Sequence, residues 1–305
     1  MYRLTGDERY LQPIIYDLLV TSERLREDLA NLHDSTFVAR RCSELRADLN
    51  PKTRKGRLRK EMFDRAGTID FHLNLLAGAH KMFDLGVSGE QRFVPLFDSA
   101  LAACRRADLG AFLLDTAVIR VYAPQAINFI HYIYDLGLGD LRQQYMGAFR
   151  RVFADQADAD LPEEDFTMKI YGLTHFITAA SRYYQRPVDS SAHAWITGYL
   201  ATNLNRILRE TKADVVAEVG ICFLLSGQSG HPAVVKCRDA LLSDFDSEAG
   251  LIPSLRGNPD PAMAEHRNIL AYMLFTWPER LHPGPRLPET TPYRDLFGAS
   301  PNLEE

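Results

Sequence analysis

The sequence predicts an all-α protein in which helical hairpins form a two-layer barrel around a polar cavity. Apolar residues recur at helical spacing through most of the chain, and no period-two alternation lasts long enough to build a sheet. Turn signals follow one another at roughly 40–50 residues, which suits one hairpin with its loops. The amphipathic segment 195–210 precedes the apolar segment 215–225, as expected of an outer helix followed by a buried inner helix.

Residues 1–60 are expected to form N-terminal helices. Apolar residues at helical spacing between Leu11 and Leu32 predict a long amphipathic first helix. A second helix is expected from Ser35 to Leu49, because Asn50 precedes Pro51 and is pushed out of the α region. The basic run Lys52 to Lys60 has no interleaved aromatic residues, so we interpret it as a solvated loop and helix start.

Residues 61–277 are predicted to form the hairpin array. Gly86 and Gly137 each close an aromatic-Asp-Leu-Gly sequence and are expected to end helices in the left-handed conformation. Comparable breaks occur at 185–187 and 226–228. The segment 118–122 is a candidate strand, since a proline follows it closely.

Prolines crowd the end of the chain after Trp277. We therefore expect residues 278–305 to form a tail without helix that packs on the surface. The whole chain, residues 1–305, is predicted to be a single helical domain.

Composition narrows the classes of protein to which the chain can belong. Apolar residues make up 46% and charged residues 25%, the balance of a folded globular protein. The net charge of −5 argues against a nucleic-acid binder. There is no CxxC pair, no signal peptide and no apolar run of membrane-spanning length. We expect a cytoplasmic protein that neither binds nucleic acid nor enters a membrane.

Five sequence blocks resemble, in the same order, an uncharacterised bacterial family that is known as a domain of unknown function. They are YGLTHFITAASRYYQ (171–185), KADVVAEVGICFLL (212–225), LIPS (251–254), AEHRNILAYMLF (264–275) and HPGPRL (282–287). This resemblance implies no activity. The hairpin pattern is also similar to the α/α toroids of some polysaccharide lyases, glycosidases and prenyltransferases, and that likeness implies a fold and not a function.

Glu218 is the most informative residue of the chain, because it is the one charged side chain within the apolar segment 215–225. A buried carboxylate must be paired, protonated, metal-bound or in contact with a wet cavity, since an unpaired buried charge costs several kcal/mol. Cys222 lies one turn further on the same face. In the structural interpretation Glu218 pairs with an arginine such as Arg267, and in the functional one it lines a cavity.

Two more polar groups interrupt apolar segments. His175 lies in one of them with Tyr171 one turn before it, and His266, Arg267 and Asn268 open another. The structural alternative makes His175 a satisfied core residue and the other group a surface cluster. Other titratable residues in apolar segments, which favour a shared polar cavity, are His72, His80 and His131.

The leading prediction is a metal-independent acid/base enzyme of the lyase or hydrolase kind. His175 or Tyr171 exchanges a proton with the substrate while Glu218 orients it, and His266 is a further acid/base candidate. Arg267 or Asn268 then neutralises a substrate carboxylate or a developing oxyanion. Proton abstraction beside a carboxylate needs this set of residue types. A small molecule, saccharide or peptide is the expected substrate, with no cofactor.

Two alternatives stay open. Glu218, Cys222, His175 and His266 together contain the ligand types that zinc prefers, although no HExxH or CxxC motif is present. The chain is alternatively a non-catalytic helical scaffold that binds a peptide or protein. Convergence of Glu218, His175 and His266 favours an enzyme, whereas separate hydrogen-bonded pairs favour the scaffold.

Overall fold

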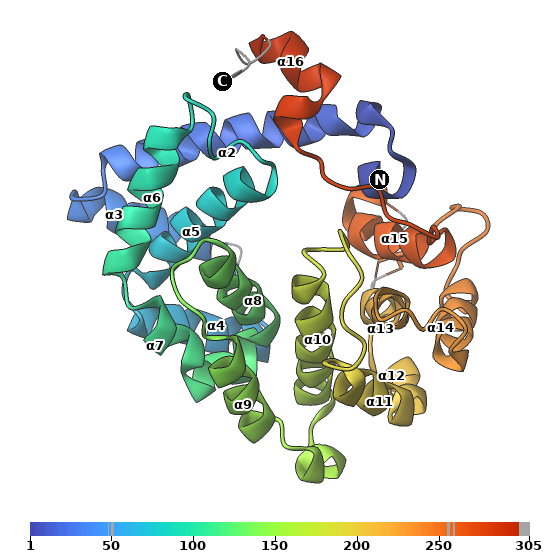
Figure 1. Cartoon of the computed structure of the whole chain (residues 1–305). Coiled ribbons are helices and arrows are strands. Elements are labelled where there is room, and N and C mark those ends of the chain that lie inside the picture. The colour runs from blue at the N-terminus through green and yellow to red at the C-terminus, as the bar shows by residue number, and fades with distance from the viewer. Residues whose placement is uncertain (48, 50–51, 255–256, 259, 299–305) are drawn as a thin grey trace. The chain divides into compact units, whose positions relative to one another are not determined.

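The computed structural model describes residues 1–47, 49, 52–254, 257–258 and 260–298, and these residues form an all-α structure (Figure 1). Within those ranges there are sixteen α-helices, three short 3₁₀ helices and no β-strand, apart from an isolated bridge between Asp246 and Leu251. The all-α prediction is therefore confirmed. Arrangement of the hairpins in a toroid stays a prediction.

The chain divides into two compact units. The first contains Met1–Ala154 together with Gly284–Glu305, and the second contains Asp155–Pro283. The first unit therefore holds both ends of the chain, and the second unit is a continuous insertion into it. Each is described by itself below, and the single-domain description stays a prediction.

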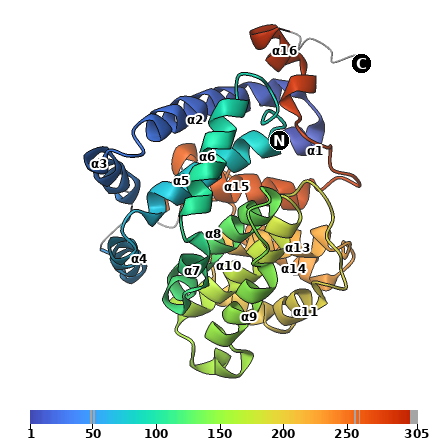
Figure 2. The same cartoon turned by 60° about the vertical axis from the view of Figure 1, so that its left-hand side comes forward.

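In the first unit, α5 packs against α2, α6 and α8, and Figure 2 shows α5 running beside α2 and α6. The buried face of α5 carries Phe71, Leu75 and Leu76, each fully excluded from solvent. The elements of this unit are α1 (Tyr2–Thr5), η1 (Glu8–Leu11), α2 (Gln12–Ala30), α3 (Ser35–Arg46), α4 (Arg54–Arg65), α5 (Ile69–Asp84), α6 (Val94–Arg106), α7 (Leu109–Leu114), α8 (Thr116–Asp135), α9 (Arg142–Val152), η3 (Leu287–Glu289) and α16 (Thr291–Phe297).

In the second unit, α13 is the central helix, with α10, α14 and α15 packed against it (Figure 1). Every residue of α13 except Asp214 is buried, which confirms the predicted burial of this helix. Its place in the inner layer of a barrel stays a prediction. The elements of this unit are η2 (Asp155–Asp160), α10 (Glu163–Ala180), α11 (Ala194–Thr202), α12 (Leu204–Glu210), α13 (Ala213–Leu225), α14 (Pro232–Ser243) and α15 (Pro261–Phe275). The expected outer helix is two helices, because the chain breaks at Asn203, the cap between α11 and α12.

Glycine ends three helices, as predicted. Gly86, Gly137 and Gly227 have φ angles of 74°, 67° and 70° at the ends of α5, α8 and α13. In each case the next residue's N–H donates to a carbonyl five residues earlier, for example Val87 to Met82 at 3.0 Å. This closure satisfies a carbonyl that the helix itself leaves unpaired.

The candidate strand at 118–122 is wrong, because this segment lies within α8. Asp115 caps that helix by accepting a hydrogen bond from the Ala117 N–H, and Pro124 is accommodated inside it. A proline inside a helix disturbs the hydrogen bonds of the preceding turn. Here Arg59 of α4 donates to the Val121 carbonyl at 2.9 Å and to the side chain of Gln125 at 3.0 Å. Part of the basic run is thus used in packing α4 against α8.

The expectation of a tail without helix is also wrong. Pro288 and Pro292 stand in the first turn of η3 and α16, where a missing N–H loses no helical hydrogen bond. Leu287 and Tyr293 are almost fully buried in the first unit. The helix expected from Ser35 to Leu49 is α3, and it ends earlier, at Arg46. The stop predicted at Asn50 and Pro51 lies outside the described residues.

Candidate acid–base site

The candidate site lies along the line where α10 packs against α13. The helix α10 contributes Tyr171, Thr174 and His175, and α13 contributes Asp214 and Glu218. Residues three or four apart share one face of a helix, so each helix presents its polar side chains together. The periodicity of the two helices therefore brings a titratable cluster to an otherwise apolar contact.

Glu218 contacts a hydroxyl and a histidine within this cluster. The Thr174 hydroxyl donates to Glu218 Oε2 at 2.6 Å, and His175 Nε2 lies 3.9 Å from Oε1. The Glu218 side chain is 5% exposed and that of His175 is 17% exposed. None of the ion pairs among the described residues joins Glu218 to Arg267, whose Nη1 instead donates to the Pro253 carbonyl at 2.7 Å.

The buried surroundings shift the two titratable groups in opposite directions. Burial raises the pKa of Glu218 to about 8, the hydrogen bond from Thr174 counteracts this, and the charge of Asp214 adds to it. Burial lowers the pKa of His175 to about 4, and the nearby His266 lowers it further. At neutral pH a protonated carboxyl therefore faces an uncharged imidazole.

Tyr171 is a hydrogen-bond donor in this cluster. Its hydroxyl donates to Asp214 Oδ2, and its ring meets the His175 ring edge-on with 6.5 Å between the centroids. Burial, then the charge of Asp214, raises the pKa of Tyr171, so the phenol keeps its proton. The other oxygen, Asp214 Oδ1, is buried and accepts no hydrogen bond from the residues that the structure describes.

The three residues of α15 have different environments. His266 is exposed, yet it lies close enough to act on the pKa of His175. The positive charge of Arg267 likewise acts on Tyr171. Asn268 holds the preceding loop, because its amide accepts from the Ile252 N–H at 2.8 Å and donates to the Ile252 carbonyl at 2.9 Å. These two hydrogen bonds give Asn268 a structural role in holding the loop. Its contact with a substrate stays a prediction.

Sequence reasoning missed Tyr184, which the turn after α10 brings back to Glu218. Arg182, Tyr183 and Tyr184 have φ angles of 52°, 52° and 69°, so three successive residues other than glycine are left-handed. Burial, then the charges of Glu218 and Cys222, raises the pKa of Tyr184. Left-handed residues of this kind cost about 1–2 kcal/mol each, and such strain is concentrated at functional sites. No glycine marks the turn, so the sequence carried no signal for it.

Comparison with known proteins gives a family for the chain. The model of a family described as "Domain of unknown function (DUF3541)" matches residues 1–300. The chain belongs to this family. The match confirms the resemblance seen in residues 171–287. No curated protein and no solved structure matches the chain. In the described part of this DUF3541 chain, no helix is long and apolar enough to cross a membrane.

Cys222 is close to the cluster but is not activated in this DUF3541 chain. Its thiol donates to the Thr174 carbonyl with 3.7 Å between sulfur and oxygen, and burial raises its pKa well above the ordinary value. A thiolate, not a thiol, is the nucleophile and the metal ligand. Across the described ranges, no group of three or more His, Cys, Asp or Glu residues is placed to hold a metal ion. The zinc alternative stays a prediction, which elemental analysis of the purified protein tests.

The other histidines in apolar segments belong to the first unit. His80 Nε2 lies 3.2 Å from Asp135 Oδ2, and the imidazole stacks on the Tyr132 ring with 3.9 Å between centroids. A ring nitrogen of His72 lies 3.1 Å from the Thr68 carbonyl. These contacts give both rings partners within their own unit. A polar cavity shared with the residues of the second unit stays a prediction.

Proposed function

We propose that the chain is an acid–base enzyme acting on a carboxylate-bearing substrate, with Glu218 as general acid and His175 as general base. The proposal depends on one observation: the two groups lie 3.9 Å apart, and burial raises the pKa of Glu218 while it lowers that of His175. Paired groups whose surroundings push their pKa values apart are the usual source of acid and base in one active site. At neutral pH each group is in the form its role requires.

The proposed step consists of two proton transfers that leave the total charge of the site and substrate unchanged. His175 Nε2 takes a proton from a substrate carbon beside the carboxylate, while Glu218 gives its proton to a substrate oxygen. The C–H and carboxyl O–H bonds break as new N–H and O–H bonds form. An imidazolium and a carboxylate then lie 3.9 Å apart, where their attraction offsets part of the cost of burying both charges. Transfer through one water returns the proton and restores the resting pair.

Neighbouring groups support the same assignment. Arg267 is close enough to Tyr171 for its positive charge to lower the pKa of that phenol. Only one of the guanidinium nitrogens of Arg267 donates to a described residue, so the others are available to a substrate carboxylate. His175 is the more exposed member of the pair and therefore the one that meets the substrate. Tyr171 keeps its proton and donates a hydrogen bond to Asp214, so it positions that carboxylate and is not a base.

Hydrogen exchange tests this proposal without knowledge of the complete reaction. The purified protein is incubated in deuterated water with hydroxy acids, keto acids and sugar acids, and deuterium uptake beside the carboxylate is measured by mass spectrometry. We expect uptake with at least one class of substrate and a loss of about 100-fold in His175→Ala and in Glu218→Gln. Arg209→Gln, at an exposed position of α12, is the control and should exchange like the wild type.

The pH profile provides a second criterion. Exchange should fall below pH 4, where His175 becomes protonated, and above pH 8, where Glu218 loses its proton. Exchange at the wild-type rate in both site variants would contradict the proposal. In the scaffold alternative, by contrast, peptide or protein binding does not depend on proton transfer, so no compound would show exchange that responds to these variants.

A further inference from the structure

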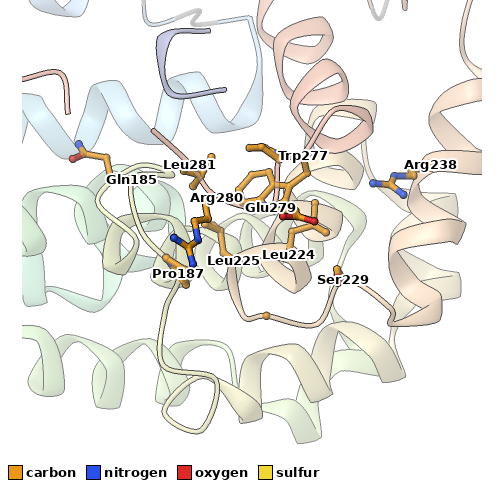
Figure 3. A pocket seen from close by; sticks show the side chains of 12 residues that line it. Gln185, Pro187, Leu224, Leu225, Ser229, Arg238, Trp277, Glu279, Arg280 and Leu281 are labelled. Carbon is orange, nitrogen blue, oxygen red and sulfur yellow. The ribbon is translucent and has the colours of Figure 1, made fainter. Parts of the chain in front are cut away.

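The second unit contains a cavity of about 610 Å³ at the carboxyl end of α13 (Figure 3). Its walls come from the turn at Gln185 and Pro187, from Leu224 and Leu225 at the end of α13, and from the segment 277–281. The volume lies within the range of sites for small molecules. His175 and Glu218 are not among the lining residues, so the cavity is distinct from the acid–base pair.

One wall of the cavity is apolar. Trp277 is half-buried, and together with Leu224 and Leu281 it lines the cavity. Figure 3 shows Trp277 and Leu224 bordering the same space. An indole ring held in this way offers a large apolar face on which a planar group can stack.

A positioned cation lies at the same cavity. Arg238 of α14 lines it, and its Nε and Nη2 both donate to the Leu274 carbonyl, at 3.1 and 2.8 Å. These bonds fix the plane of the guanidinium and leave Nη1 without an acceptor among the residues that the structure describes. A guanidinium that is already held in place loses little conformational entropy when it binds a carboxylate.

Charge at the cavity favours an anion. Arg280 and Glu279 also line it, and neither forms an ion pair within the described part of the chain. Two guanidiniums against one carboxylate leave an excess positive charge at the opening. The cavity therefore combines a stacking surface with a positioned cation and a second, exposed one.

We propose that this cavity binds an anion with a flat apolar body, of which an aromatic carboxylate is the simplest form. The ring stacks against Trp277, and the carboxylate accepts a hydrogen bond from Arg238 Nη1 with support from the charge of Arg280. The proposal does not depend on the acid–base function, because it uses no residue of that site.

Fluorescence of Trp277 provides the test. The chain contains two tryptophans, Trp195 and Trp277, so a Trp195→Phe variant of the full chain leaves Trp277 as the only indole. The probes are phenylacetate, its uncharged analogue 2-phenylethanol, and acetate, which carries the charge without the ring. We expect a saturable change of Trp277 emission with phenylacetate, and binding at least about tenfold weaker for both other probes.

Arginine variants in this background identify the cation. Arg238→Gln should weaken phenylacetate binding about tenfold, and Arg280→Gln should weaken it by a smaller factor. Arg209→Gln is the matched control, since it removes an exposed arginine of the same unit away from the cavity. Because Arg238 also holds Leu274, the thermal midpoint is measured for each variant. Arg280→Gln, which breaks no hydrogen bond to a described residue, keeps the test decisive if Arg238→Gln unfolds.

Three results would overturn the proposal: no saturable signal with phenylacetate, equal affinity for 2-phenylethanol, or unchanged phenylacetate affinity in both folded arginine variants. His175→Ala separates this proposal from the proposed enzyme function. It should abolish proton exchange and leave phenylacetate binding unchanged, so that either proposal can fail while the other stands.

Discussion

At the scale of single residues, Glu218 and His175 respond to the same buried surroundings in opposite ways. Removal of water disfavours the charged form of each group, which is the carboxylate for Glu218 and the imidazolium for His175. The Thr174 hydroxyl stabilises the carboxylate only in part, so the pKa of Glu218 stays at about 8. The pair is therefore uncharged between about pH 4 and pH 8.

This pair makes stability depend on pH in a predictable direction. Folding raises the pKa of Glu218 from 4.5 to about 8, so its contribution to stability is complete below pH 4.5 and is lost as the pH rises through 8. Folding lowers the pKa of His175 from 6.5 to about 4, so its contribution is complete above pH 6.5 and is lost as the pH falls. Between pH 4.5 and pH 6.5, the pKa values of the two groups in the unfolded chain, a rise in pH lowers the stability contribution of Glu218 and increases that of His175. Above pH 6.5 the change in stability with pH comes mainly from Glu218.

We expect the free energy of unfolding of the wild type to decrease by about 1–2 kcal/mol more than that of Glu218→Gln between pH 6.5 and pH 8. The glutamine keeps the shape of the side chain and has no proton to lose. Urea unfolding of both proteins at the two pH values measures the difference. Parallel decreases in the two proteins would show that Glu218 titrates in the folded state at its ordinary pKa.

At the scale of the elements, the end of α10 differs from the other helix ends. It closes with the same type of bond as the glycine turns, since the Tyr183 N–H donates to the Thr178 carbonyl at 2.9 Å. Arg182 takes the position that glycine occupies elsewhere, and two more left-handed residues follow it. The Ser181 hydroxyl oxygen accepts from the Tyr184 N–H at 2.8 Å and supports this backbone. The strained turn is what carries Tyr184 back toward Glu218.

A second feature at this scale is the close approach of three helices at Gly220. A Cβ atom added there would lie 2.7 Å from Leu274 Cδ1 and 3.2 Å from Cys237 Cβ. Both neighbours are fully buried, so they have little room to move. We expect Gly220→Ala to lower the free energy of unfolding by about 1–2 kcal/mol, although alanine is the better helix former.

Gly198 provides the matched control for this substitution. It lies in α11, and an added Cβ there would meet nothing within 4 Å. Gly198→Ala should therefore raise the free energy of unfolding by about 0.5–1 kcal/mol. Chemical unfolding of both variants checks the opposite signs, and stabilisation by Gly220→Ala would mean that α13, α14 and α15 are not in close contact at this point.

At the scale of the whole molecule, segments from the two ends of the chain meet within the first unit. The Leu287 N–H donates to the Leu85 carbonyl at 2.9 Å, and the Thr291 N–H donates to Glu8 at 3.2 Å. Arg92 lies over the Phe297 ring, 4.2 Å from its centroid. Leu287 and Tyr293 of this segment are thus part of the core of the first unit. Packing of residues 278–305 on the surface stays a prediction.

We therefore expect a single substitution near the end of the chain to destabilise the first unit. Leu287 is completely buried, and Leu287→Ala should lower the free energy of unfolding by about 2–4 kcal/mol. Leu296 is 56% exposed, so Leu296→Ala should change it by less than about 0.5 kcal/mol. Thermal and chemical unfolding compare the two, and equal effects would contradict the assignment of Leu287 to the core.

Some of the candidate site was visible in the sequence and some was not. Glu218 was found because a carboxylate within an apolar helix has a large desolvation cost, and His175 and Tyr171 because helical spacing puts them on one face. Thr174 and Asp214, which contact Glu218 and Tyr171, were missed, because neither residue type is unusual in a helix. The two hydrogen bonds between the Asn268 amide and the backbone of Ile252 were also not predicted, because they depend on how the preceding loop folds.

The all-α class, the burial of α13 and the glycine-closed helix ends could be predicted from the residues alone, because they follow from local periodicity and backbone sterics. The folded structure was needed to establish that segment 118–122 is helical and that Tyr184 returns to Glu218. It was also needed to show that residues 287–297 form helices whose Leu287 and Tyr293 pack into the first unit. Each of these depends on contacts between residues distant in sequence, such as the bonds from Arg59 to α8. The local preference of a segment for helix or strand contributes less free energy than such contacts, so the contacts decide its structure.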